Sequence, residues 1–220
     1  FSELKIPAII GDHMVLQQKQ ANPIWGWDDP GTEVTVTLGD QTKKATAGDD
    51  GKWTVKLDPL DASFEPGTLT IAGTSKQVIK DVLVGEVWMC SGQSNMGMTV
   101  SGDWKHKVET LASNHPNLRL ITVPRVGTQE LQTDFEGQWE PANETNIPRF
   151  SAVGFFFGRY LHEILDVPVG LINNAGGGSA AEAWVRRESL EKDPRFAATM
   201  ESWVNREKQL QTEEAKTQYE

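Results

Sequence analysis

The chain has 220 residues and a mass of 24.4 kDa, and its 21 basic and 31 acidic residues give a formal net charge of −10. This charge argues against sequence-independent binding to nucleic acid, which depends on Lys and Arg neutralising phosphates. The apolar runs are far shorter than the roughly 20 residues that a membrane-spanning helix requires, so no membrane span is expected. The single cysteine, Cys90, excludes an intrachain disulfide framework and a cysteine-based zinc cluster.

Residues 1–81 are predicted to form a small all-β sandwich domain. Turn-forming residues recur at short intervals, as in Asp29-Pro30-Gly31. Between the turns, apolar and polar residues alternate at 34–38, 53–57 and 69–71. Such alternation places one face of each strand on a core, and short strands between regular turns are typical of a sandwich.

Residues 82–220 show a different pattern, which predicts the first part of an α/β domain with a parallel sheet. The segment 82–90 is mostly apolar without alternation, which is typical of a strand buried on both faces. Further strands are predicted at 118–123 and 169–172. Strands alternating with helices favour α/β layers, and we place the domain boundary between 80 and 84.

Two helices are predicted in this second part. The first begins after Ser151, its predicted N-cap, and ends before Pro168. Its expected core-facing stripe consists of Val153, Phe156, Phe157, Tyr160, Leu161, Ile164 and Leu165. The second begins near Pro194, and its many charged residues favour a solvated helix over a nucleic-acid or membrane role.

The segment that points most clearly to a catalytic role is Gly92-Gln93-Ser94-Asn95-Met96, directly after the predicted buried strand. In open α/β sheets, sites form beyond the carboxyl ends of the strands. A serine at that position presents its hydroxyl where backbone N–H groups of a following helix also point, which is the arrangement an oxyanion needs. An ordinary loop of turn-forming residues is the alternative for such a short motif.

The sequence GEVWMCSGQSNM at 85–96 resembles the nucleophile block of the sialate O-acetylesterase family, which belongs to the SGNH (GDSL-like) hydrolase superfamily. Similar blocks occur as DHMVLQ at 12–17, PIWG at 23–26, DPG at 29–31, DGKW at 50–53 and at 172–184. The likeness runs in the family's order from about residue 5 to residue 195.

The resemblance implies a carbohydrate O-acetylesterase, with 9-O-acetylated sialate as the leading substrate. Ser94 matches the nucleophile, which forms an acyl-enzyme. The oxyanion would be held by the N–H groups of Ser94 and Gly178, or of Gly177 in its place, because glycine allows the backbone to approach a substrate closely. We assign Gln93 and Asn95 to substrate binding. No cofactor and no metal are implied, and members are usually secreted or periplasmic.

Two residues depart from the family pattern. Gly176 stands where members usually carry a tryptophan, and Gly97 stands where many carry a glutamate. Loss of a tryptophan beside the oxyanion loop would widen or loosen the pocket, so an acetylxylan-type esterase stays open as an alternative.

The family's catalytic base comes from a C-terminal Asp-x-x-His, and a further block supplies an Asn oxyanion donor. Neither occurs before Glu220. Because a serine hydroxyl needs a base within hydrogen-bond reach, we expect the histidine and aspartate to come from a C-terminal segment or a second chain. This chain would then be a fragment or one piece of the enzyme.

The chain's own histidines are weaker candidates for the base. Asp103 and His106 have the Asp-x-x-His spacing, but they lie in a region that varies in the family, so an accidental match is favoured. His13 is expected to pack or hydrogen-bond in the β domain, His115 to be solvated in a loop, and His162 to be a satisfied surface group.

Three other residues have two interpretations each. Cys90 is expected to act as a small hydrophobe, because nothing nearby in the sequence would lower its pKa and make it a nucleophile. Arg125 and Arg149 are candidates for meeting a sialate carboxylate, although solvation at the surface is the simpler expectation.

Two non-catalytic hypotheses also remain: a carbohydrate-binding protein that keeps the pocket without turnover, and an assembly protein that uses the N-terminal sandwich as its interaction surface. The Ser94 block favours the esterase, since neither alternative needs a nucleophile.

Overall fold

The structure is a computed structural model that describes residues 3–102, 107, 114–126 and 131–210. It consists of two compact units, Phe1–Gly177 and Gly178–Glu220, which we describe separately. Within the described ranges, no helix combines the length and the apolar character needed to cross a bilayer.

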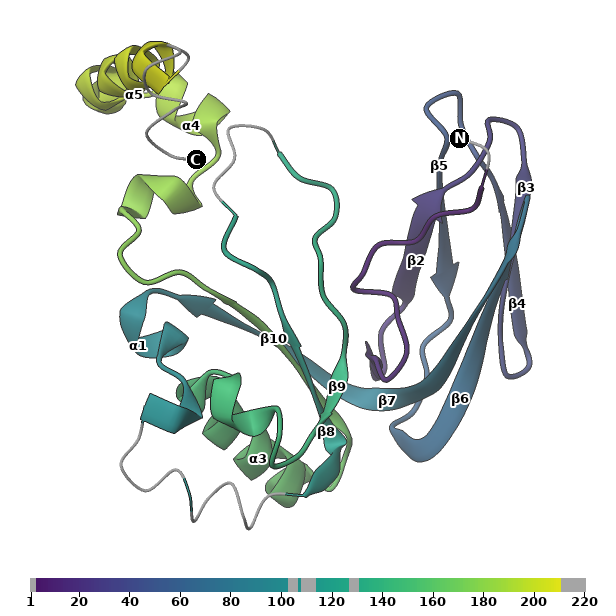
Figure 1. Cartoon of the computed structure of the whole chain (residues 1–220). Helices are drawn as coiled ribbons and strands as arrows, with labels where there is room; N and C mark the ends of the chain where they lie inside the picture. Colours follow the sequence, from purple (N-terminus) through teal and green to yellow (C-terminus); the bar gives the residue numbers. More distant parts are fainter. Residues whose placement is uncertain (1–2, 103–106, 108–113, 127–130, 211–220) are drawn as a thin grey trace. The chain divides into compact units, whose positions relative to one another are not determined.

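The first unit begins with a series of strands, several of which alternate between buried and more exposed residues. They are β1 (Val15–Gln17), β2 (Asn22–Trp27), β3 (Glu33–Leu38), β4 (Gln41–Thr46), β5 (Lys52–Leu57) and β6 (Ser63–Ala72). β2 pairs with β5 in a two-stranded antiparallel sheet, while β4, β3 and β6 are neighbours in a larger sheet (Figure 1). Side chains from both sheets, including Trp53 and Val36, share one hydrophobic core. The strands predicted at 34–38, 53–57 and 69–71 are therefore confirmed.

A single long strand, β7 (Lys76–Gly92), pairs with three other strands, including β1, which lies parallel to its residues 83–85. Its first part pairs with β6 in antiparallel orientation, and its residues 86–92 pair with β10 (Val169–Ala175) in parallel. β10 in turn pairs in parallel with β8 (His115–Thr122), which carries the short antiparallel strand β9 (Glu140–Ala142). The sheet is thus mixed, and β7 runs through the predicted domain boundary, which stays a prediction.

The expectation that 82–90 is buried on both faces is wrong for its second half. Val82 and Leu83 are buried, but Trp88 is 43% exposed and Met89 is 62% exposed. Within the described residues, β10 is the only strand paired with 86–92, and the Phe157 ring of the helix that follows covers Trp88 only in part. A strand that is apolar on both faces therefore lies at an edge with part of its surface open.

The helix α3 (Ala152–Leu165) begins directly after Ser151, as the sequence predicts. The Ser151 side chain caps it by accepting a hydrogen bond from the Gly154 N–H at 3.0 Å. It ends at Asp166, which adopts a left-handed conformation (φ 51°), two residues before Pro168.

The buried face of α3 differs from the predicted stripe. Ala152, Gly154, Phe155 and Gly158 are buried, whereas five members of the stripe are exposed: Val153, Phe157, Tyr160, Ile164 and Leu165. A methyl group at Gly158 would lie 2.5 Å from Leu171 Cδ1, so the glycine lets α3 lie close against β10. Hydrophobic periodicity cannot detect such a face, since glycine has no apolar side chain to count.

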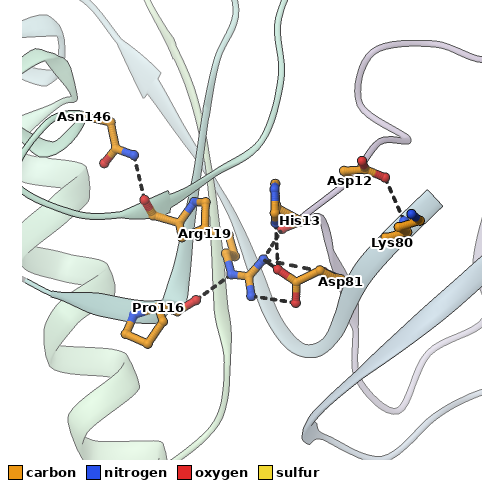
Figure 2. A network of polar contacts seen from close by, with 8 residues as sticks. Asp12, His13, Lys80, Asp81, Pro116, Arg119 and Asn146 are labelled. Carbon is orange, nitrogen blue, oxygen red and sulfur yellow. Dashed lines mark hydrogen bonds and ion pairs between the residues drawn. The ribbon is translucent and has the colours of Figure 1, made fainter.

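An ion-pair network joins β8 to β7 and to the turn that precedes β1 (Figure 2). The Arg119 side chain is 4% exposed, and it donates to both carboxylate oxygens of Asp81 at 2.7 and 3.0 Å. Asp81 also contacts His13 Nδ1 at 2.6 Å, which confirms the expected hydrogen bonding of His13. Both Asp81 and His13 have positive φ (55° and 69°), a strained conformation for residues other than glycine. The hydrogen bonds from Arg119 hold the pKa of Asp81 below its usual value of 3.8.

Shorter helical segments complete the described structure. In the first unit these are α1 (Ser94–Gly97), η1 (Val100–Gly102) and η2 (Ile147–Arg149). The second unit contains η3 (Ala181–Trp184), α4 (Arg187–Glu191), η4 (Pro194–Phe196) and α5 (Ala197–Leu210). An ion pair between Arg187 and Glu207 at 2.8 Å links α4 to α5. The predicted C-terminal helix is confirmed as α5, and most of its described side chains are exposed.

Candidate active site

The parallel strands β7, β10 and β8 end at one edge of the sheet. Gly92 is the register partner of Ala175, and Thr122 is the partner of Asn173. The chain therefore leaves this edge in three neighbouring loops, which begin after residues 92, 122 and 175. This is the position at which open α/β sheets place their sites.

The first loop makes a tight turn that exposes Ser94. Gly92 has a φ of +145°, which L side chains rarely adopt, so glycine is required there. One helical turn, α1, follows, with the Gly97 N–H bonded to the Gln93 carbonyl at 2.8 Å. Ser94 is exposed, and its Oγ donates to Gln93 Oε1 at 3.3 Å. The hydroxyl is thus accessible at the sheet edge, beside the exposed Gln93 and Asn95.

The glycine loop after β10 begins directly against Ser94. A methyl group at Gly177 would lie 3.3 Å from Ser94 Cα and 3.4 Å from Ser94 Oγ. The preceding Gly176 donates its N–H to the Gly92 carbonyl at 2.9 Å, which ties the two loops together. Gly178 has a φ of +81° and belongs to the second unit, so its part in an oxyanion hole stays a prediction.

The N-terminus of α3 is hydrogen-bonded to α1 and to the residue that follows it. The hydroxyl of Ser151, a fully buried residue, donates to the Met96 carbonyl at 2.6 Å while it caps α3. The Ala152 N–H donates to the Met98 carbonyl at 2.8 Å. The sequence indicates the cap, but only the fold shows that the same hydroxyl also fixes the turn that carries Ser94.

The histidines within the described residues lie toward the opposite end of the parallel strands from Ser94. His115 is the first residue of β8, and His162 contacts the Val167 carbonyl just before β10 at 2.7 Å. His13 contacts Asp81, which precedes the parallel part of β7. Because that part of β7 spans roughly 20 Å, these side chains are far beyond hydrogen-bond reach of Ser94 Oγ. Asp103 and His106 lie outside the described residues.

His115 differs from its predicted state as a solvated loop residue. It begins a strand, is half-buried, and packs against the Phe155 ring at a centroid distance of 6.1 Å. Burial lowers its pKa, with a further contribution from the charge of Arg159. The sequence prediction failed because the packing partner, α3, lies 40 residues further along the chain.

Cys90 behaves as the sequence predicts. It is buried in β7, with Sγ 2.9 Å from the position that a methyl group at Gly154 would occupy. Burial raises the pKa of its thiol to about 11, so the neutral thiol predominates at physiological pH.

The sequence and this structure match known carbohydrate esterases. The family described as carbohydrate esterase, sialic acid-specific acetylesterase, matches residues 84–216. The chain belongs to this family. Its curated relatives include the sialate O-acetylesterases of Mus musculus, 34% identical over 206 residues, and of Homo sapiens, 35% identical over 207 residues. Each alignment covers 84% of this chain, but only 38% and 39% of the respective relative.

A solved structure agrees with this membership of the sialic acid-specific acetylesterase family. The crystal structure of a novel carbohydrate acetylesterase from Xanthomonas citri superposes with a TM-score of 0.82 at 33% sequence identity. The match covers 86% of this chain and 44% of that one. The chain therefore spans about two-fifths of the length of the relatives that it matches.

Proposed function

We propose that this chain carries the nucleophile of a carbohydrate O-acetylesterase, with O-acetylated sialate as its leading substrate. The observation that carries the proposal is the exposed hydroxyl of Ser94 at the end of β7, with the backbone of Gly177 against it. A carbonyl carbon bound there would have a nucleophile on one side and backbone N–H groups nearby, as acyl transfer requires.

The proposed reaction proceeds in two steps. Ser94 Oγ attacks the acetyl carbonyl carbon while a base takes the hydroxyl proton, and the oxyanion is held by the N–H groups of Ser94 and Gly178 or Gly177. The bond from the carbonyl carbon to the sugar oxygen then breaks, and the sugar oxygen takes the proton from the base. Water attacks the acetyl-serine in the same way and releases acetate and free Ser94.

We propose that the base, a histidine paired with an aspartate, comes from a C-terminal segment or a second chain. The distance of the described histidines from Ser94 supports this requirement. A second support is an apolar surface formed by Trp88 of β7 and by four exposed residues that follow each other at helical spacing on α3, namely Val153, Phe157, Tyr160 and Ile164. These exposed side chains include Trp88 and Phe157 in edge-to-face contact at 5.3 Å, and adjoining apolar surface of this kind marks an interaction site.

The proposal also includes a division of the chain into two domains. Residues 1–81 would form a β-sandwich domain, and residues 82–220 the beginning of an SGNH-type hydrolase domain. Export to the periplasm or the outside of the cell is expected by resemblance to the family. An intact-mass measurement on the natural protein tests whether further polypeptide supplies the base. We expect either a longer polypeptide or a companion chain that carries Asp-x-x-His.

The decisive experiment uses the protein together with the segment or companion that supplies the base. It compares wild type with Ser94→Ala in the hydrolysis of 4-nitrophenyl acetate, with Ser101→Ala as a matched control at a nearby exposed serine. A fluorophosphonate probe followed by peptide mass spectrometry should place its adduct on Ser94. Equal hydrolysis by wild type and Ser94→Ala would overturn the esterase proposal, and retained sugar binding in that case would favour the non-catalytic alternative.

A further inference from the structure

The side chain of Arg125 reaches from the loop after β8 across the end of β10. Its Nε donates to the Ala175 carbonyl at 3.2 Å, which fixes the plane of the guanidinium. Its Nη2 lies 2.8 Å from the position that a methyl group at Gly97 would occupy. That same position is 4.0 Å from the Gly177 backbone nitrogen, so the guanidinium lies at the edge of the site that contains Ser94.

The absence of a side chain at Gly97 is what makes room for this arrangement. Any Cβ at position 97 would meet the guanidinium at less than 3.0 Å, and Arg125 would have to move. Arg125 is also exposed, so part of its side chain is open to solvent.

Arg125 differs from the other arginine considered for carboxylate binding. Arg149 Nη2 already contacts both oxygens of Glu140, at 2.6 and 2.5 Å, so its charge is neutralised within the protein. Among the described residues, no carboxylate pairs with Arg125, and its one hydrogen bond uses Nε and leaves both Nη groups available. A pre-oriented guanidinium with two free amino groups suits a carboxylate, which it can bind through parallel N–H···O bonds.

We propose that Arg125 binds the carboxylate of an acidic O-acetylated sugar and sets the preference of the Ser94 site for such substrates over neutral acetylated sugars. The inference rests on the proposed function, which it deepens. An acidic monosaccharide carries its carboxylate and its acetyl ester on one small molecule, so both groups can be held from the same sheet edge. On this basis an acidic sugar is favoured over acetylated xylan as the substrate class.

The test is a titration of this chain with N-acetylneuraminic acid and with its carboxyl methyl ester, followed by ligand-observed NMR at low and high salt. Because hydrogen bonds to a charged group are stronger than neutral ones, wild type should bind the acid about tenfold more tightly than the ester. Arg125→Gln should bind both compounds equally, and Arg125→Lys should keep part of the preference. Arg149→Gln, which removes the same charge elsewhere, should keep all of it.

Each outcome decides the inference. A preference that falls with salt and disappears in Arg125→Gln alone supports it, since a purely structural arginine would not separate the two ligands. Equal binding of acid and ester by wild type, binding of neither, or a preference that persists in Arg125→Gln overturns it. Ser94→Ala should keep the preference for the acid, so failure of the esterase proposal, seen in hydrolysis, is distinct from failure of this one.

Discussion

The hydroxyl of Ser151 donates to the backbone carbonyl of Met96 at 2.6 Å while it accepts from the N–H of Gly154 at 3.0 Å. One buried oxygen therefore fixes both the first turn of α3 and the turn that exposes Ser94. The stability of a helix terminus and the geometry of the candidate nucleophile depend on the same atom.

Replacing Ser151 with Ala should lower the free energy of unfolding by about 1–2 kcal/mol, because a helix cap is lost and the Met96 carbonyl loses a donor. It should also slow labelling of Ser94 by a fluorophosphonate under native conditions. Urea unfolding and labelling rates measure the two effects. Ser101→Ala serves as the control, and loss of stability with unchanged labelling would contradict the coupling.

Replacing Gly177 with Ala should reduce the reactivity of Ser94 severalfold with little loss of stability. The added methyl group would sit 3.4 Å from Ser94 Oγ, in the space that an acetyl group would enter, but it meets no buried core. Gly102→Ala is a matched control, because its methyl group would make only ordinary contact, at 3.5 Å from Met98 Cγ. If Gly177→Ala and Gly102→Ala slowed the labelling of Ser94 by the same factor, the placement of Gly177 at the site would be contradicted.

Replacing Asp81 with Asn should destabilise the protein by about 2–3 kcal/mol, because Arg119 would keep its buried charge without a counter-ion. Partial exposure of Asp81 places this cost at the low end of the range for broken buried ion pairs. Urea unfolding at pH 7 measures the difference. A change below about 0.5 kcal/mol would show that solvent replaces the carboxylate.

The same pair predicts part of the acid sensitivity of the fold. The folded pKa of Asp81 lies below its usual 3.8, chiefly through the hydrogen bonds from Arg119. The stability that the ionised carboxylate contributes is therefore fully present above pH 3.8 and is lost as the pH falls through the lowered folded pKa. Unfolding curves should converge for wild type and Asp81→Asn in this acidic window, and parallel curves would contradict the assignment.

Cys90 should report on unfolding. Because its thiol is buried with a pKa raised to about 11, reaction with a disulfide reagent at pH 7.5 should be far slower in the native state than in urea. As the chain has one cysteine, the labelling rate measures the opening of β7 and α3 directly. Rapid native labelling would show that α3 does not stay packed on the sheet.

Local sequence patterns predicted much of the fold correctly. Alternation predicted β3 and β5, and the Ser151 cap together with Pro168 predicted the limits of α3. These features depend on interactions within a few residues. The buried face of α3 was missed because it consists of Gly154 and Gly158, whose role is to bring the helix backbone close to β10.

The sequence by itself determined several of the strands, among them β3 and β5, the helix α3 and the block that contains Ser94, because strand alternation, capping and motif spacing are local properties of the chain. Only the tertiary structure decided what surrounds that block. It placed Gly177 against Ser94, Arg125 beside Gly97, and the described histidines at the other end of the strands. The reason is physical: parallel pairing brings together residues that lie 83 positions apart in β7 and β10 and 51 positions apart in β8 and β10, and no local pattern encodes that distance.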